Sequence, residues 1–167
     1  MIVFLIGFMG SGKTHWGKIW AQQTGLPFFD LDEVIEEQEN KTIAAIFEQD
    51  GENYFRQRET EVLESFSCKT NAIISCGGGT ACFNNNMQWM NDTGTTVYFS
   101  ATAPQIIKRI IDERAKRPVF RDVTGENLLP FIENKLIERE PFYSQAKIIL
   151  PVSDITASSI EKILQHE

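Results

Sequence analysis

The sequence contains few of the residues that build disulfide frameworks or zinc sites. Among its 167 residues are two histidines and three cysteines, Cys68, Cys76 and Cys82. The cysteines are odd in number, show no C-x-x-C spacing and have no histidine nearby, which argues against both kinds of site. We therefore interpret them as reduced cysteines with a structural role.

Long apolar runs and an excess of basic residues are also missing. No run approaches the roughly 18 residues that a membrane-spanning helix needs, and the apolar residues 1–6 lack the basic segment of a secretory signal. The formal net charge is -7. Nucleic acids and membrane surfaces are themselves polyanions, so neither is expected as a partner. The sequence predicts a cytoplasmic protein in which any anion-binding site is locally basic.

Strand-like and helix-like segments alternate along the chain, without an internal repeat, a low-complexity tract or a linker. Strands are expected at residues 1–6, 28–32, 72–75, 95–99 and 147–152. Helices are expected at residues 13–24, 43–47 after an N-cap at Thr42, 52–66, 84–91, 104–113 and 127–139, with a last one after a capping box at Ser158. The alternation predicts a three-layer α/β/α fold with a five-stranded parallel sheet, and the length fits one domain spanning residues 1–167.

The glycine-rich stretch at residues 7–14, here called the phosphate-binding loop, carries the strongest chemical signal. Its letters GFMGSGKT fit G-x-x-x-x-G-K-[ST], and it stands between an apolar strand and a segment that can be helical. In this pattern backbone amides surround phosphates, the lysine reaches the outer phosphates and the hydroxyl residue binds Mg²⁺. The helix N-terminus also favours anions. The stretch predicts a nucleoside triphosphate site; an ordinary glycine-rich turn is the weaker alternative.

Two aspartates stand at the end of the second expected strand. Alternation along a strand would place Asp30 and Asp32 on one face, roughly 6.6 Å apart, where both could serve one metal-phosphate centre. Solvated turn acids, or an aspartate N-cap for a helical segment at 33–39, explain them equally well.

Two further features allow a structural and a functional interpretation. Arg56 and Glu59 are i, i+3 neighbours on the expected helix, either as a surface ion pair or as an arginine held in one rotamer to grip a carboxylate.

Gly77, Gly78 and Gly79, here called the glycine triplet, follow the third strand. Three glycines predict positive φ angles or a close approach of another group to the backbone, and a plain tight turn is the alternative.

Basic residues gather in one part of this acidic chain. They are Lys108, Arg109, Arg114, Lys116, Arg117 and Arg121. Pro118, Gly125 and the lack of periodicity between them predict a mobile loop. A solvated charge run is the usual explanation, but a lid at about 112–125 that brings arginines to a polyphosphate is favoured here. Arg139, near the end of the following helix, is either a helix-end cation or part of a site.

Together these motifs resemble the shikimate kinase family, a nucleoside-monophosphate-kinase-like group of P-loop enzymes, over nearly the whole chain. They are residues 7–14, Asp30-x-Asp32, the FRQRE segment at 55–59, residues 77–79, Arg117-Pro118 and Arg139-x-x-x-Tyr143. The family transfers the γ-phosphoryl group of ATP to the 3-hydroxyl of shikimate, on the route to chorismate and the aromatic amino acids. The resemblance implies ATP and shikimate as substrates, Mg²⁺ as the metal, a monomer, a mobile lid and a substrate-binding helical region at about 31–60.

The resemblance also assigns roles to single residues. For the nucleotide and metal it implies Gly10, Ser11, Gly12, Lys13 and Thr14 around the triphosphate, a backbone contact at most from His15, Arg109 against adenine, and Mg²⁺ bound by Thr14 directly and by Asp30 through water. For the acceptor it implies Asp32 at the reacting hydroxyl, Arg56 and Arg139 on the carboxylate, and the backbone of Gly77, Gly78 and Gly79 along the ring. Lys13, Asp32 and Arg117 would be catalytic, with Arg117 on the transferring phosphoryl group.

Some features depart from the family pattern, and other functions were weighed. His15-Trp16, Thr80-Ala81 and Val119-Phe120 replace residues that are more usual in the family. A gluconate or nucleotide kinase shares the loop and lid, but the paired arginines and the glycine triplet favour a carboxylated polyol as acceptor. A nucleotide-dependent switch would carry an acid after an apolar strand, whereas the third strand here runs into glycines.

Overall fold

A computed structural model describes residues 1–113 and 125–165 of the chain. Its sheet has five parallel strands in the order β2-β3-β1-β4-β5. The strands are β1 (Ile2–Ile6), β2 (Phe28–Asp30), β3 (Ala72–Ser75), β4 (Thr95–Ser100) and β5 (Ile148–Pro151). The five-stranded parallel sheet predicted from the sequence is therefore confirmed.

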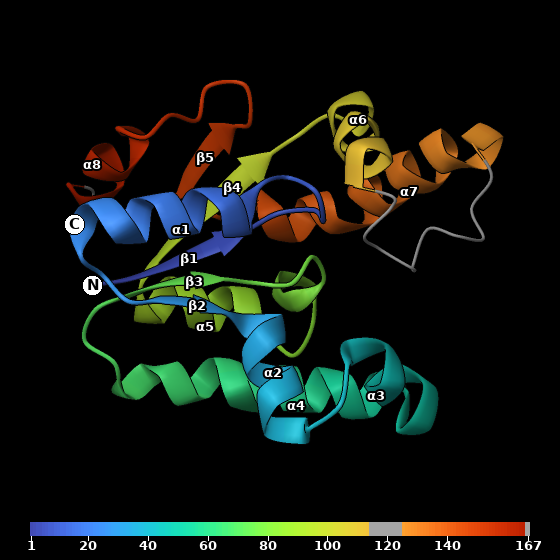
Figure 1. Cartoon of the computed structure of the whole chain (residues 1–167), viewed down its shortest axis with the longest axis horizontal. Coiled ribbons are helices and arrows are strands. Elements are labelled where there is room, and N and C mark those ends of the chain that lie inside the picture. Colours follow the sequence, from blue (N-terminus) through green and yellow to red (C-terminus); the bar gives the residue numbers. More distant parts are fainter. Residues whose placement is uncertain (114–124, 166–167) are drawn as a thin grey trace.

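Helices cover both faces of this sheet (Figure 1). They are α1 (Lys13–Thr24), α2 (Leu31–Glu39), α3 (Ile43–Gln49), α4 (Gly51–Ser65), α5 (Asn86–Thr93), α6 (Ala103–Glu113), α7 (Gly125–Tyr143) and α8 (Ser159–Leu164), with short 3₁₀ turns η1 (Phe66–Cys68) and η2 (Thr80–Cys82). Within the described ranges, none of these helices combines the length and apolarity needed to cross a membrane.

The central strand β1 explains how the layers are held together. All five of its residues are buried, as expected for a parallel strand covered on both faces. Phe4 packs into a cluster with Leu63 of α4 and Met90 of α5. Leu5 points to the opposite face and belongs to a cluster with Trp20 of α1. The strand thus anchors the phosphate-binding loop, which follows it directly, in the centre of the core.

The second strand is shorter than predicted. β2 ends at Asp30 and α2 begins at Leu31. Asp30 is the N-cap of α2, and its side chain accepts a hydrogen bond from the Asp32 amide at 3.1 Å. The prediction that both aspartates share one face of a strand is wrong, because the cap satisfies an amide of the first helical turn and ends the strand. The alternative of an aspartate N-cap is confirmed.

Other helix ends agree with the sequence in part. Thr42 caps α3, with its hydroxyl accepting from the Ala45 amide at 3.2 Å, as predicted. The capping box at Ser158 is wrong, since this side chain makes no cap bond to α8 and instead lies 3.0 Å from the Thr156 hydroxyl. Helix α7 runs on through Pro141 to Tyr143.

Most of the expected lid lies outside the described residues. The segment 114–124 includes Arg117 and three more of the basic residues named above. The expected roles of the lid and of Arg117 therefore stay predictions.

Candidate active site

The register of the sheet brings three polar segments to one edge. Ser75, the last residue of β3, is the register partner of Leu5 in β1 and of Asp30 in β2. The carboxyl ends of parallel strands face the same side, which is where α/β proteins bind ligands. The phosphate-binding loop, the start of α2 and the glycine triplet consequently meet beyond this edge.

The phosphate-binding loop closes around the ammonium group of Lys13. This buried side chain donates to the carbonyl of Gly7 at 2.8 Å and to that of Phe8 at 2.9 Å. Gly12, with φ of 95°, forms the left-handed N-cap of α1, so the loop needs a glycine there. A lysine at a helix N-terminus inside a ring of backbone is the arrangement that binds polyphosphate.

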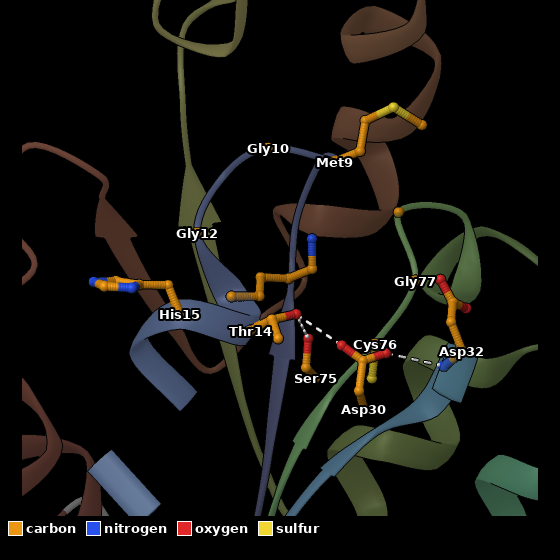
Figure 2. Close-up of a pocket in the computed structure, with 12 residues that line it drawn as sticks. Met9, Gly10, Gly12, Thr14, His15, Asp30, Asp32, Ser75, Cys76 and Gly77 are labelled. Atoms are coloured by element: carbon orange, nitrogen blue, oxygen red, sulfur yellow. Dashed lines mark hydrogen bonds between the residues drawn. The ribbon is translucent and has the colours of Figure 1, made fainter. Parts of the chain in front are cut away.

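Thr14, Asp30 and Ser75 point toward one another beneath the loop (Figure 2). The Thr14 hydroxyl donates to Asp30 Oδ2 at 2.7 Å and lies 3.2 Å from Ser75 Oγ. Hydroxyl and carboxylate oxygens suit Mg²⁺, which usually keeps several waters and phosphate oxygens as its other ligands. The pair therefore fits a magnesium ion even though no cluster of three acidic, histidine or cysteine ligands occurs in the part of the chain that the structure describes.

A pocket of about 170 Å³ lies between the phosphate-binding loop and the glycine triplet (Figure 2). Its lining residues are Met9, Gly10, Gly12, Lys13, Thr14, His15, Asp30, Asp32, Ser75, Cys76, Gly77 and Gly78. One pocket thus joins the predicted nucleotide side to the predicted acceptor side. Ser75 was not among the predicted site residues.

Asp32 is a lining residue whose acidity is altered by its surroundings. Burial, followed by the negative charges of Asp30 and Glu59, raises its pKa from 3.8 to about 6, against the opposing effect of Lys13. A carboxylate with this pKa is mostly ionised at neutral pH and is a better proton acceptor than an ordinary aspartate.

This raised pKa predicts a gain in stability for Asp32→Asn when Mg²⁺ and nucleotide are absent. The folded state binds the proton more tightly than the unfolded chain, so ionised Asp32 destabilises the fold above pH 6 by up to about 3 kcal/mol, and this penalty fades as the pH falls toward 4. Urea unfolding should therefore find the variant more stable than wild type at pH 8 and nearly equal at pH 4. An equal difference at both pH values would contradict the assignment.

The glycine triplet allows side chains to approach the backbone closely. None of its three residues has a positive φ. A β-carbon at position 79 would lie 2.6 Å from Arg56 Nη2, and one at position 78 would lie 3.1 Å from Arg139 Nη1. The close-approach interpretation is confirmed and the positive-φ interpretation is wrong. The triplet brings two guanidinium groups to neighbouring peptide units.

The Arg56–Glu59 pair lies inside the protein. Glu59 is 1% exposed and accepts a hydrogen bond from Arg56 Nη1 at 2.8 Å. The guanidinium also stacks on the Phe83 ring, with its central carbon 4.1 Å from the ring centroid. The surface ion pair considered from the sequence is therefore wrong, and the arginine is held in a defined orientation.

Arg139 presents a guanidinium nitrogen that lacks a hydrogen-bond partner. Its Nη1 atom is buried and unpaired within the described ranges 1–113 and 125–165. Leaving a buried charged donor unpaired costs free energy, so this atom indicates a missing anionic ligand. Tyr143, one helical turn away, donates its hydroxyl to the Gly78 carbonyl. Burial raises the pKa of the Tyr143 phenol, so the hydroxyl keeps the proton for this bond.

Two predicted nucleotide contacts lie at the rim of the loop. Arg109 of α6 donates from Nη1 to the Gly10 carbonyl at 3.3 Å. His15 is exposed in the first turn of α1, with its ring edge-on to Trp16 at 5.4 Å between centroids. Both residues lie beside the loop, and the nucleotide contacts expected of them, through the backbone at most for His15, stay predictions.

Comparisons with known proteins agree over nearly the whole chain. A family model described as shikimate kinase matches residues 9–166. The chain is 42% identical over 159 residues to a shikimate kinase of Azobacteroides pseudotrichonymphae genomovar. CFP2, covering 95% of this chain and 94% of that protein. It is 40% identical over 157 residues to one of Parabacteroides distasonis, covering 94% and 91%.

Solved structures give the same result. A shikimate kinase from Bacteroides thetaiotaomicron has a TM-score of 0.89 at 37% identity, covering 99% of this chain and 94% of that one. A shikimate kinase from Acinetobacter baumannii, solved in complex with shikimate, has a TM-score of 0.84 at 31% identity, covering 98% and 90%. A gluconokinase from Sinorhizobium meliloti, at 14% identity and a TM-score of 0.57, covers 98% and 89% and shares the fold alone.

Proposed function

Because this chain belongs to the shikimate kinase family, we propose that its pocket moves the γ-phosphoryl group of ATP to the 3-hydroxyl of shikimate. The chain is an ATP-dependent phosphotransferase that acts on shikimate. The observation that best supports the assignment to this pocket is that Lys13, Thr14 and Asp32 line one space, with the unpaired Arg139 nitrogen against Gly78, a residue of the same lining. ADP and shikimate 3-phosphate would be the products.

The donor half of the site is the phosphate-binding loop. The amides of residues 10–14 would bind the triphosphate, and Lys13 would exchange its two loop carbonyls for β- and γ-phosphate oxygens. In a loose phosphoryl-transfer transition state the protein contributes mainly positioning and charge stabilisation. Arg109 at adenine and Arg117 at the transferring group complete this half by resemblance to the family.

Thr14 and Asp30 are the residues that would hold Mg²⁺. The Thr14 proton is already directed at Asp30, so the lone pairs of the hydroxyl oxygen remain available to a cation. When bound, the ion would neutralise charge on the phosphate oxygens. Asp30 also caps α2, so the same carboxylate that would help to hold the ion accepts the hydrogen bond of the Asp32 amide.

The acceptor half centres on Asp32. As the 3-hydroxyl oxygen forms its bond to the γ-phosphorus, the hydroxyl proton passes to the Asp32 carboxylate, and the bond from phosphorus to the β,γ-bridging oxygen breaks to leave ADP. Arg56 and Arg139 would hold the shikimate carboxylate, while the backbone of the glycine triplet lines the ring. This arrangement explains why an acidic protein places two arginines beside adjacent peptide units.

The remaining expectations concern the whole molecule. A monomeric state, a cytoplasmic location, a single domain at 1–167, a substrate-binding region at about 31–60 and a lid at about 112–125 stay predictions. Sedimentation at micromolar concentration would test the first, with a mass near one chain as the expected result.

A coupled assay of ADP release tests the proposed reaction. With Mg²⁺ and ATP present, we expect kcat/KM for shikimate to exceed that for quinate, gluconate and nucleoside monophosphates by more than about 100-fold, because binding a carboxylated polyol through specific hydrogen bonds is selective. Removing Mg²⁺ with a chelator should abolish turnover. ADP release at the same rate with no acceptor present would contradict a kinase and favour a nucleotide-driven switch.

A further inference from the structure

The residue after the glycine triplet carries a hydroxyl group that the reaction described so far does not use. We propose that Thr80 is a positioning residue that orients Arg56 for the acceptor carboxylate by acting through Glu59. The inference rests on the proposed function, which places Arg56 at that carboxylate.

Glu59 links the two side chains. Thr80 Oγ1 donates to Glu59 Oε1 at 2.6 Å, and Arg56 Nη1 donates to Glu59 Oε2 at 2.8 Å. Glu59 is 1% exposed and Thr80 is fully buried. Each carboxylate oxygen therefore has one charge-assisted partner, as a buried carboxylate requires.

Thr80 is itself fixed in place at both ends of its backbone. Its amide donates to the Gly77 carbonyl at 3.2 Å, and its carbonyl accepts from the Asn86 side chain at 3.0 Å. Asn86 is 1% exposed and also accepts from the Thr60 hydroxyl at 3.1 Å, which ties this loop to α4. The Thr80 hydroxyl is thus aimed at Glu59 by a buried network and not by a flexible surface loop.

The remaining contacts of Arg56 cannot set its orientation alone. The guanidinium carbon lies over the rings of Phe83, Phe55 and Phe47, at 4.1, 5.1 and 6.0 Å from their centroids, and these cation–π contacts do not direct its N–H groups toward any one acceptor. The Glu52 carboxylate lies 3.4 Å from Arg56 Nε, but its side chain is more than half exposed, so this ion pair contributes little to holding the guanidinium in place. The hydrogen bond to Glu59 therefore sets the direction of the Arg56 guanidinium. The orientation of the Glu59 carboxylate depends in turn on the hydrogen bond from the Thr80 hydroxyl. Without that donor, the Glu59 carboxylate can rotate and accept a hydrogen bond from a second Arg56 nitrogen. This second bond draws the guanidinium group away from the carboxylate of the acceptor.

Two substitutions at position 80 separate orientation from packing. Thr80→Val keeps the volume and removes the hydroxyl, and we expect KM for shikimate to rise about tenfold with kcat and KM for ATP within about threefold of wild type. Thr80→Ser keeps the hydroxyl and removes a buried methyl group, so it should lower the melting temperature while leaving KM for shikimate near wild type. Steady-state kinetics and thermal unfolding measure both effects.

Two further variants serve as controls. Thr96 is another fully buried threonine, but it lies in β4 and not in η2, and its hydroxyl donates to Asn91 at 2.6 Å. Thr96→Val should lower stability without changing KM for shikimate. In an Arg56→Ala background, Thr80→Val should change KM by less than about twofold, because residues acting through one another are not additive.

The outcomes distinguish this inference from the proposed function. A raised KM in Arg56→Ala with an unchanged KM in Thr80→Val would overturn the role of Thr80 alone. An equal effect of Thr80→Val with and without Arg56 would also overturn it, since the hydroxyl would then act elsewhere. An unchanged KM in Arg56→Ala would reject the carboxylate clamp, and the positioning role with it.

Discussion

Asp32→Asn is expected to lower kcat for shikimate phosphorylation by about 1,000-fold while KM for ATP stays within about threefold of wild type. The amide keeps the shape of the side chain but cannot accept the hydroxyl proton. ATP affinity should persist because the residues that surround the phosphates lie on the loop and not on α2. Steady-state assays varying each substrate, with ATP binding checked by calorimetry, measure the two effects separately.

Glu33 provides a matched control for this substitution. It is the next residue on α2 and loses the same charge in Glu33→Gln, but it is exposed and faces Lys18 at 3.8 Å. A surface pair of this kind contributes little, so kcat should be unchanged. Near-normal turnover in Asp32→Asn would place the proton acceptor on another residue. A loss of turnover in both variants would point instead to the net charge of the helix.

Asp32 also illustrates a tension between stability and activity at this site. The burial and neighbouring carboxylates that raise its pKa also make its ionised form unfavourable in the fold. The same substitution is therefore expected to stabilise the metal-free protein and to inactivate the enzyme. That pairing of effects is typical of catalytic residues held in strained electrostatic surroundings.

Local sequence was sufficient for the features whose residues are contiguous. The phosphate-binding loop follows a buried strand and begins a helix, so its pattern and context lie within 24 residues. The order of strands and helices could be predicted for the same reason. The boundary between β2 and α2 at Asp30 could not be predicted, because an aspartate that ends a strand and one that caps a helix look alike in sequence. Which of the two forms depends on where β2 stops pairing with β3.

Burial and register decided what the sequence left open. Whether Arg56 and Glu59 form a surface pair depends on η2, which lies about 20 residues further along the chain and covers them. Ser75 joins Thr14 and Asp30 only through the pairing of three strands, and a serine at a strand end carries no local signal of this. Long-range packing of this kind has no counterpart in periodicity or spacing.

The unpaired guanidinium nitrogen of Arg139 gives the largest expected effect on acceptor binding. A buried guanidinium nitrogen without a hydrogen-bond partner is a cost that the free protein carries and that an anionic ligand removes. Preorganisation of this kind strengthens binding because the side chain is already ordered by α7 and lies over the Phe8 ring, 5.1 Å from its centroid. The shikimate carboxylate is the anion that the proposed reaction supplies.

Arg139→Ala is therefore expected to raise KM for shikimate by about 100-fold, equivalent to ~3 kcal/mol, with KM for ATP unchanged. Arg139→Lys should recover only part of the loss, because an ammonium cannot present two parallel donors. Arg58 is the matched control: its guanidinium donates to Glu39 at 2.7 Å and also contacts Glu61, away from the glycine triplet. Arg58→Ala should leave both KM values near wild type. An unchanged KM for shikimate in Arg139→Ala would refute the clamp and assign the carboxylate to another part of the pocket.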